Sequence, residues 1–219
     1  NFMLYERGIK VVEAKEIMKE ELRPAELQFV KITLDNCDFC FDVETIVNEL
    51  KNQNIDVASE ETFSSNSLQG KEFITKYGIK KFPTVIVSGE IKKSEQLTSY
   101  FENKGEIKGG RFIYNAQTPP YFDALSSQIT GLVKITHIVD SSCEKCTDLS
   151  PITSAMGEQG VFIQDEQFIE YNSNEGQELI EKFSVKQIPA VLISKEIDYY
   201  PDVKNALIQS GAKEKGEFY

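Results

Sequence analysis

The residues that most directly indicate chemistry in this sequence are its four cysteines. They form two Cys-x-x-Cys pairs, Cys37 with Cys40 and Cys143 with Cys146, and the 219 residues contain no other cysteine. Two thiols at this spacing can close a short disulfide and reopen it by thiol–disulfide exchange. We predict that each pair forms its own disulfide, with Cys37 and Cys143 as nucleophiles and Cys40 and Cys146 as the thiols that resolve a mixed disulfide.

Two other interpretations of the cysteine pairs remain open. Four thiolates can hold a zinc ion or an iron–sulfur cluster, although zinc ribbons usually separate their pairs by about 15–20 residues. The thiols can also be inert structural groups. Because each pair occupies its own half of the chain, the spacing favours redox chemistry, and we expect neither a metal nor a cofactor.

The sequence also repeats itself at a fixed offset. Cys143 follows Cys37 by 106 residues, and the same offset relates several other identical residues. They are Cys40 and Cys146, Asp42 and Asp148, Gly70 and Gly176, Lys76 and Lys182, Pro83 and Pro189, Ile91 and Ile197, and Phe112 and Phe218. A unit of this length is far longer than a solenoid repeat, so each copy is expected to fold as a domain.

We predict a first domain over residues 1–115 and a second over residues 116–219. The proline-containing segment 115–120 marks the boundary, because it interrupts the periodicity of both flanking regions. The first domain carries an additional N-terminal helix, predicted over Val11–Leu22.

Each copy has the same predicted order of elements. Apolar, β-branched runs at 28–34 and 132–139 predict buried strands that lead into the cysteine pairs. The apolar spacing of Val43–Leu50 predicts a helix whose N-terminus holds the cysteines. The following elements are predicted as strands at 55–58 and 161–163, helices at 70–77 and 176–183, strands at 84–88 and 190–194, strand-like residues at 90–91 and 196–197, and a final helix.

This order predicts an α/β fold in which a mixed β-sheet is flanked by helices. Strands separated by a helix are expected to pair in parallel, and the last two strands of each domain to pair antiparallel.

A cysteine at a helix N-terminus has a lowered thiol pKa, because the helix dipole and unpaired N–H groups stabilise the thiolate. The residues between the cysteines then distinguish the two pairs. Asp38 follows Cys37, whereas Glu144 and Lys145 follow Cys143. A neighbouring carboxylate disfavours a thiolate and an ammonium favours it, so Cys143 is predicted to be the more acidic thiol, with the more oxidising disulfide.

With these residues the chain resembles the thioredoxin superfamily, and in particular its two-domain, protein disulfide isomerase-like and glutaredoxin-like oxidoreductases. The resemblance rests on a strand that enters each Cys-x-x-Cys and on Phe82-Pro83 and Ile188-Pro189 before a later strand. It implies that Pro83 and Pro189 are cis prolines facing the cysteines, and that the backbone of Phe82 and Ile188 binds substrate. It also implies protein thiols or disulfides as substrates, with a reductase or oxidase as partner.

The sequence departs from the family pattern around both pairs. There is no tryptophan, and Asn36 and Ser142 precede the first cysteines. The family's buried acid, six residues ahead of the first cysteine, is replaced by Lys31 and His137. The proton acceptor is therefore not identifiable from the sequence.

The remaining charged residues suggest little chemistry. His137 is expected to be a satisfied core residue, with the tuning of Cys146 as the alternative, while Glu60-Glu61 and Asp165-Glu166 are expected to be solvated turn residues. A net charge of −11 argues against binding to nucleic acid.

No apolar run approaches the roughly 18 residues of a membrane-spanning helix. With Asn1 as the first residue, a cytoplasmic location and an extracytoplasmic one with a missing N-terminal anchor both stay open.

We predict a thiol–disulfide oxidoreductase that acts on protein disulfides through a mixed-disulfide intermediate. Two alternatives remain: an electron-relay module for a dedicated redox partner, and a non-catalytic, peptide-binding scaffold. The sequence does not indicate the direction of electron flow.

Overall fold

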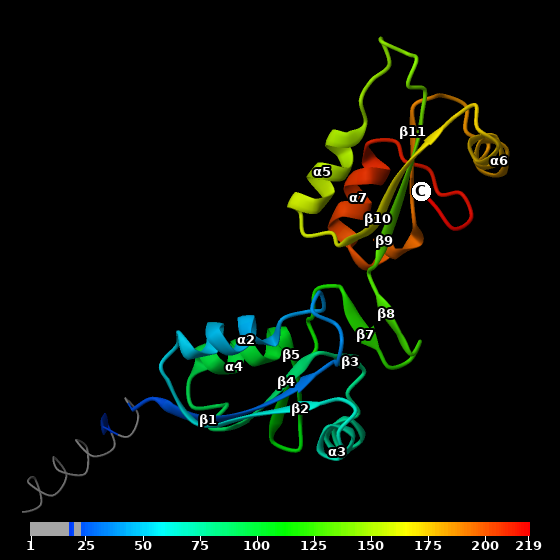
Figure 1. Ribbon diagram of the computed structural model, residues 1–219. Coiled ribbons are helices and arrows are strands. Elements are labelled where there is room, and N and C mark those ends of the chain that lie inside the picture. The colour runs from blue at the N-terminus through cyan, green and yellow to red at the C-terminus, as the bar shows by residue number, and fades with distance from the viewer. Residues whose placement is uncertain (1–17, 20–22) are drawn as a thin grey trace, which may run out of the picture. The chain divides into compact units, whose positions relative to one another are not determined.

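The computed structural model describes residues 18–19 and 23–219 (Figure 1). The chain divides into two compact units, Asn1–Gln117 and Thr118–Tyr219, here called unit 1 and unit 2. This division falls two residues beyond the boundary expected from the sequence. The helix predicted over Val11–Leu22 lies almost entirely outside the described residues.

Unit 1 contains one mixed sheet with strand order β2-β1-β4-β6-β5. Strand β1 pairs in parallel with β2 and antiparallel with β4. The elements are β1 (Ala25–Thr33), α2 (Val43–Lys51), β2 (Ile55–Ser64), α3 (Leu68–Tyr77), β3 (Lys81–Phe82), β4 (Thr84–Gly89), α4 (Glu95–Lys104), β5 (Gly105–Lys108) and β6 (Arg111–Tyr114).

Helices cover both faces of this sheet (Figure 1), and the inner strand β4 buries four consecutive residues, so its side chains are buried on both sides. Phe29 of β1 packs in one buried cluster with residues of α2 and α4, including Leu50 and Phe101. Helix α3 covers the opposite face, where Phe73 stacks on Phe63 of β2 with ring centroids 5.7 Å apart. The central strand β1 is therefore enclosed by helices on both sides.

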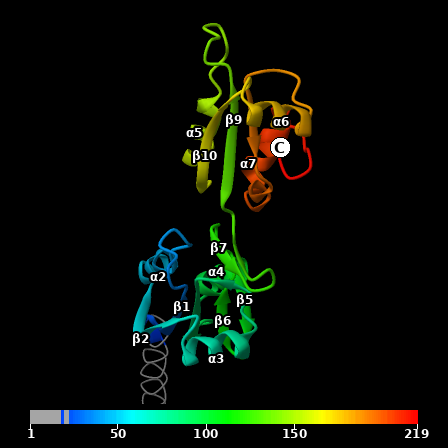
Figure 2. The same cartoon turned by 45° about the vertical axis from the view of Figure 1, so that its right-hand side comes forward.

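Unit 2 is built on a three-stranded sheet of order β10-β9-β11. Figure 2 shows β9 and β10 side by side; they are parallel, and β11 is antiparallel to β9. The elements are β7 (Tyr121–Asp123), β8 (Gln128–Thr130), β9 (Val133–Val139), α5 (Ser150–Glu158), β10 (Ile163–Glu170), α6 (Asn174–Phe183), β11 (Ala190–Ile193), the 3₁₀-helix η1 (Lys195–Tyr199) and α7 (Pro201–Gln209).

The core of unit 2 has the same layers. Met156 of α5 and Val203 of α7 pack with Ile135 of β9 on one face. Phe183 of α6 packs with Ile138 of β9 on the other. Strand β9 is thus the buried centre of unit 2, as β1 is of unit 1.

The fold class expected from the sequence is confirmed, and three details of it are corrected. Residues 90–91 lie in a turn and residues 196–197 in η1, so neither forms a strand. Strands β1 and β4 are antiparallel although helices separate them, and the antiparallel hairpin β5–β6 follows α4.

Strands β2 and β10 are longer than predicted and include the acids that were expected to lie in turns. Glu60 is part of β2 and Glu166 is part of β10. Both strands lie at an edge of their sheet, where charged side chains are common and interrupt the apolar pattern. Lys31 and His137 bind these two acids, so the expectation that the acids are merely solvated is wrong.

Candidate redox sites

Each cysteine pair forms a disulfide within its own unit, as the sequence predicts. Cys37 is bonded to Cys40 with an S–S distance of 2.00 Å, and Cys143 to Cys146 with one of 2.08 Å. Each disulfide closes a tight turn. The N–H of Cys40 donates to the carbonyl of Cys37 at 3.1 Å, and that of Cys146 to the carbonyl of Cys143 at 3.3 Å.

The turns lie before the helices, so the predicted placement of the cysteines at a helix N-terminus is wrong. Helix α2 begins at Val43, after Asp42 has capped it by accepting a 2.9 Å bond from the N–H of Glu44. Helix α5 begins at Ser150, whose N–H donates to Asp148 at 2.9 Å. Because the field of a helix terminus weakens beyond its first turn, the lowered thiol pKa that was expected from a helix N-terminus has no basis in this structure.

The cysteines differ in exposure. In unit 1 both are buried, with 8% of Cys37 and 9% of Cys40 exposed. In unit 2 Cys143 is half-buried and Cys146 is exposed. In unit 1 the two cysteines are equally buried, so their exposure does not indicate which one is the nucleophile. In unit 2 Cys146, the predicted resolving thiol, is more exposed than Cys143. The assignment of Cys37 and Cys143 as nucleophiles therefore stays a prediction.

Strand register brings each predicted proline to the end of the sheet where the cysteines lie. Thr84, directly after Pro83, pairs with Ile32 near the end of β1. Ala190, directly after Pro189, pairs with Ile138 near the end of β9. The chain leaves β1 and β9 at these ends to form the cysteine turns.

Both prolines follow a cis peptide bond, Phe82–Pro83 and Ile188–Pro189. Phe82 and Pro83 are buried, and Ile188 and Pro189 are half-buried. Gln117 donates to the carbonyl of Pro83 at 3.1 Å. Contact between these residues and a substrate stays a prediction.

Lys31 lies in an ion-pair cluster of unit 1. Its ammonium binds the carboxylates of Glu44 and of Glu60, the latter at 2.7 Å, and Lys51 also binds Glu60 at 2.6 Å. Burial opposes the charge on Lys31, but the bonds to Glu44 and Glu60 outweigh it and raise the pKa of Lys31. Lys31 and Lys51 in turn lower the pKa of Glu60 by their hydrogen bonds.

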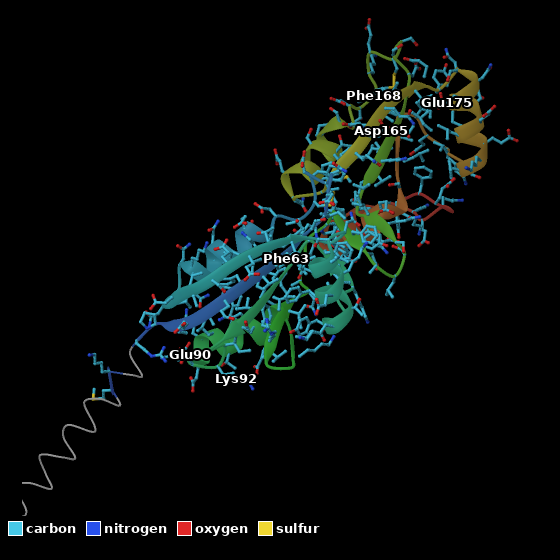
Figure 3. The ribbon with its side chains drawn as sticks, turned by 60° about the horizontal axis from the view of Figure 1, so that its bottom comes forward. Phe63, Glu90, Lys92, Asp165, Phe168 and Glu175 are labelled. Atoms are coloured by element: carbon cyan, nitrogen blue, oxygen red, sulfur yellow. A yellow bond between two sulfur atoms is a disulfide. The ribbon has the colours of Figure 1, made fainter. Side chains whose placement is uncertain are left out.

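His137 occupies the equivalent place in unit 2. Its Nε2 lies 2.8 Å from Oε1 of Glu166, and its ring stacks on Phe168 of β10 at 4.4 Å between centroids. Figure 3 shows Phe168 and the neighbouring Asp165 on this strand. The hydroxyl of Thr153 and then the His137 ring hold the pKa of Glu166 below its usual range, against the effect of burial.

Sequence reasoning missed Glu60 and Glu166 as partners of the two bases. The sequence contained a signal for them, because the acids are 106 residues apart, as are Lys31 and His137. Within the described residues, no three His, Cys, Asp or Glu side chains gather as a set of metal ligands, and no helix is long and apolar enough to span a membrane.

A cleft of about 550 Å³ lies beside the proline turn of unit 2. Apolar side chains from α5, β11 and α7 line it, and three lysines stand among its lining residues. These residues include Leu149, Ile152, Pro189, Leu207, Lys186 and Lys213. The cleft offers apolar surface beside Pro189 and Ala190.

Comparisons with known proteins give structural likeness only. No family model and no curated protein matches the chain. A protein disulfide oxidoreductase from Aeropyrum pernix K1 matches with 18% identity and a TM-score of 0.24, over 93% of this chain and 94% of that one. Full-length ERdj5 matches with 11% identity and a TM-score of 0.23, over 88% of this chain and 30% of that one. Human ERp44 matches with 14% identity and a TM-score of 0.20, over 87% and 54%.

The fold follows from the topology of each unit. A central strand leads to a Cys-x-x-Cys turn and a helix, a parallel strand and a second helix follow, and a cis proline precedes an antiparallel strand on the other side of the central one. Both units are thioredoxin-like. Each thioredoxin-like unit has a disulfide and a cis proline at the same end of its sheet, and unit 2 has a further cis bond, Pro119–Pro120.

Proposed function

We propose that the protein is a thiol–disulfide oxidoreductase that acts on protein thiols and disulfides. The main support for this proposal is the position of the disulfide in each unit. It follows the end of the central strand, and the strand that begins after Pro83 or Pro189 pairs with that same end. Two cysteines three residues apart can pass between disulfide and dithiol within one turn.

The exchange takes place in two substitutions at sulfur. A substrate thiolate attacks one sulfur of the Cys-x-x-Cys disulfide; the bond between the protein's cysteines breaks, and a mixed disulfide forms. The second substrate thiolate attacks the mixed disulfide and releases the reduced cysteine pair and an oxidised substrate. Two electrons and two protons pass from the substrate dithiol to the protein, and the reverse sequence reduces a substrate disulfide.

Residue roles within this proposal follow the sequence predictions. Cys37 and Cys143 form the mixed disulfide, and Cys40 and Cys146 resolve it. The backbone at Phe82-Pro83 and at Ile188-Pro189 pairs with the substrate chain. The cleft beside Pro189 supports a polypeptide substrate, because its apolar lining suits side chains that flank a substrate cysteine.

Insulin reduction by dithiothreitol tests the proposal. The protein is expected to accelerate precipitation of the insulin B chain, and the Cys37→Ser/Cys143→Ser double variant is expected to lose the acceleration. Variants with one serine, Cys37→Ser or Cys143→Ser, keep one intact pair and serve as matched controls for folding and for the share of each site. Equal rates for the wild-type protein, the double variant and dithiothreitol alone would refute the proposal and favour a scaffold.

A further inference from the structure

Strand β11 has an open edge in unit 2. The N–H of Ile193 donates to the carbonyl of Tyr219 at 3.1 Å, and the N–H of Tyr219 donates back to Ile193 at 2.9 Å. These bonds lie on the side of β11 that faces away from β9. Residues two positions apart in a strand direct their N–H and C=O groups to the same side, so those of Val191 also face away from β9. Within the residues that the structure describes, neither group of Val191 has a hydrogen-bond partner.

The equivalent edge is covered in unit 1. Val85 corresponds to Val191, since each is the second residue after a cis proline. Strand β6 runs beside β4 there, and the hydroxyl of Thr84 donates to the carbonyl of Tyr114 at 2.6 Å. Thr84 and Val85 are completely buried, whereas Val191 is half-buried. Unit 2 therefore leaves open, beside β11, the place that a strand fills in unit 1.

A cleft of about 550 Å³ lies along this open edge. Its lining includes the residues of β11 and, from the helices on one face of the sheet, Ile152 of α5 and Leu207 of α7. Leu207 packs with Val191 at the buried cluster of that face, and 39% of Ile152 is exposed. An extended segment beside β11 can therefore bury apolar side chains against α5 and α7.

The other face of the cleft is formed by α6 and the residues that follow α7. Phe218 packs on Phe183 of α6 with ring centroids 5.1 Å apart, and the N–H of Lys215 donates to the carbonyl of Phe218 at 2.8 Å. Lys186 comes shortly after the end of α6, and both lysines line the cleft. This face thus carries positive charge, while the face formed by α5 and α7 is apolar.

The lysines of the cleft have no acidic partner. All of them are exposed, and none forms an ion pair with a described residue. The neighbouring acids Glu214 and Glu217 bind other lysines, Lys195 and Lys182. In a chain with a net charge of −11, such a cluster is suited to an acidic ligand. The lysines are Lys186, Lys213 and Lys215.

We propose that unit 2 binds an extended segment of a partner protein, in which apolar and acidic residues alternate, as an additional strand beside β11. The N–H and C=O of Val191 pair with the backbone of the segment, as in strand addition to other open sheet edges. Successive side chains of a strand point to opposite faces, so the apolar residues face α5 and α7 and the acidic residues face the lysines. The inference goes beyond the proposed function, because the cysteines take no part in this binding.

A second copy of the chain suits this edge less well. Two β11 strands that paired edge to edge would bring the lysines of both clefts together, and like charges in such a contact oppose association. The excess of positive charge therefore favours an acidic segment of another protein.

The binding of a synthetic peptide to the full-length, wild-type protein tests this proposal. The probe is an acetylated and amidated heptapeptide of alternating valine and glutamate, titrated at low salt. NMR should show saturable binding, with the amide hydrogen exchange of Val191 slowed by about tenfold or more, because its N–H becomes hydrogen-bonded. The same peptide with methyl groups on the backbone nitrogens that face β11 should bind about tenfold more weakly or not at all.

Lys186→Glu should raise the dissociation constant of the peptide by about three- to tenfold, since it replaces an attraction by a repulsion. Lys134→Glu is the matched control, because Lys134 is exposed on β9, does not line the cleft and likewise forms no ion pair with a described residue. It should change the dissociation constant by less than about twofold. A heptapeptide of alternating valine and lysine should show no measurable binding.

Unchanged exchange at Val191 in the presence of saturating peptide would overturn the inference, as would equal binding of the valine–lysine peptide or equal effects of Lys186→Glu and Lys134→Glu. Protection of Val191 that appears without peptide and grows with protein concentration would show a second copy at this edge, and would overturn it as well. None of these outcomes involves disulfide exchange, so a failure to accelerate insulin reduction would refute the proposed function and leave this inference standing.

Discussion

Asp38 stands between the cysteines of unit 1, whereas Glu144 and Lys145 stand between those of unit 2. Since neither pair lies in a helix, the expected difference in thiol acidity rests on these side chains and on the burial of the two cysteines. Cys37 is buried and Cys143 half-buried, and burial disfavours the thiolate. Both differences favour ionisation of Cys143.

We therefore expect a lower apparent pKa for Cys143 than for Cys37. The measurement is the rate of iodoacetamide alkylation against pH in variants that keep one cysteine pair. Lys145→Gln should raise the apparent pKa of Cys143, and Asp38→Asn should lower that of Cys37. An apparent pKa of Cys143 at or above that of Cys37 would contradict the expectation.

The Arg23–Glu90 ion pair makes the stability of unit 1 depend on pH. Arg23 donates two hydrogen bonds of 2.6 Å to Glu90, and the N–H of Glu26 donates a third at 3.0 Å. Figure 3 shows Glu90 on the surface of unit 1. These bonds lower the pKa of Glu90 from 4.5 to about 2. Because the folded pKa is the lower one, the stabilisation is complete above pH 4.5 and is lost as the pH falls towards 2.

Carbon-13 NMR of the Glu90 carboxyl group should report a pKa of about 2. Arg23→Met should raise this pKa, because it removes the largest stabilising contact of the carboxylate. Lys93→Met is the matched control: its ammonium lies 3.7 Å from Glu90, so the shift should be smaller. An ordinary pKa for Glu90 in the wild-type protein would show that the ion pair does not form in solution.

At the level of residues, the sequence predicted both disulfides because Cys-x-x-Cys spacing is a local signal. It did not predict that Glu60 binds Lys31 or that Glu166 binds His137. Those bonds join residues 29 positions apart in each unit, and they depend on the parallel register between neighbouring strands. Such a register cannot be derived from periodicity within one strand.

Among the elements, the second helix of each unit was the easiest to predict. Helices α3 and α6 end at Tyr77 and Phe183, where the sequence places them. Each helix runs over ten residues and ends at a residue followed by one in the left-handed conformation, Gly78 or Ser184. The cysteines were wrongly placed at a helix N-terminus, because the apolar pattern does not show that Asp42 and Asp148 stand between the cysteine turns and the helices.

The start of α6 depends on a close approach of backbone segments. Ser173 caps the helix by accepting a 2.9 Å bond from the N–H of Gly176. A Cβ atom at Gly176 would overlap the carbonyl oxygen of Glu170. The same contact occurs in α3 between Gly70 and the carbonyl of Ser64, which explains why both copies have glycine at this position.

Gly176→Ala should therefore destabilise the protein by about 1–3 kcal/mol in urea unfolding, as an overpacked site does. Gly157→Ala is the matched control in the same unit. A Cβ atom at Gly157 in α5 meets nothing within 4 Å, so the better helix propensity of alanine should stabilise the protein by up to about 1 kcal/mol. Equal effects of the two substitutions would contradict the close contact at Gly176.

At the scale of the whole molecule, the two units share a core topology and differ at its margins. The sheet around β1 has five strands and the sheet around β9 has three, among the described residues. In unit 1 Ile86 and Val87 pair with β6, whereas in unit 2 the equivalent contact is reduced to an isolated bridge between Ser194 and Phe218. The fixed sequence offset predicted the shared core and could not show which peripheral strands are formed.

We predict that both units exchange disulfides with a protein substrate. The most direct measurement is the capture of a mixed disulfide between a disulfide-containing polypeptide and the reduced Cys40→Ser or Cys146→Ser variant. Non-reducing electrophoresis and peptide mass spectrometry should show the substrate bonded to Cys37 in the first variant and to Cys143 in the second. The absence of any mixed disulfide in both variants, together with a folded protein that does not accelerate insulin reduction, would show that neither unit exchanges disulfides with a protein substrate.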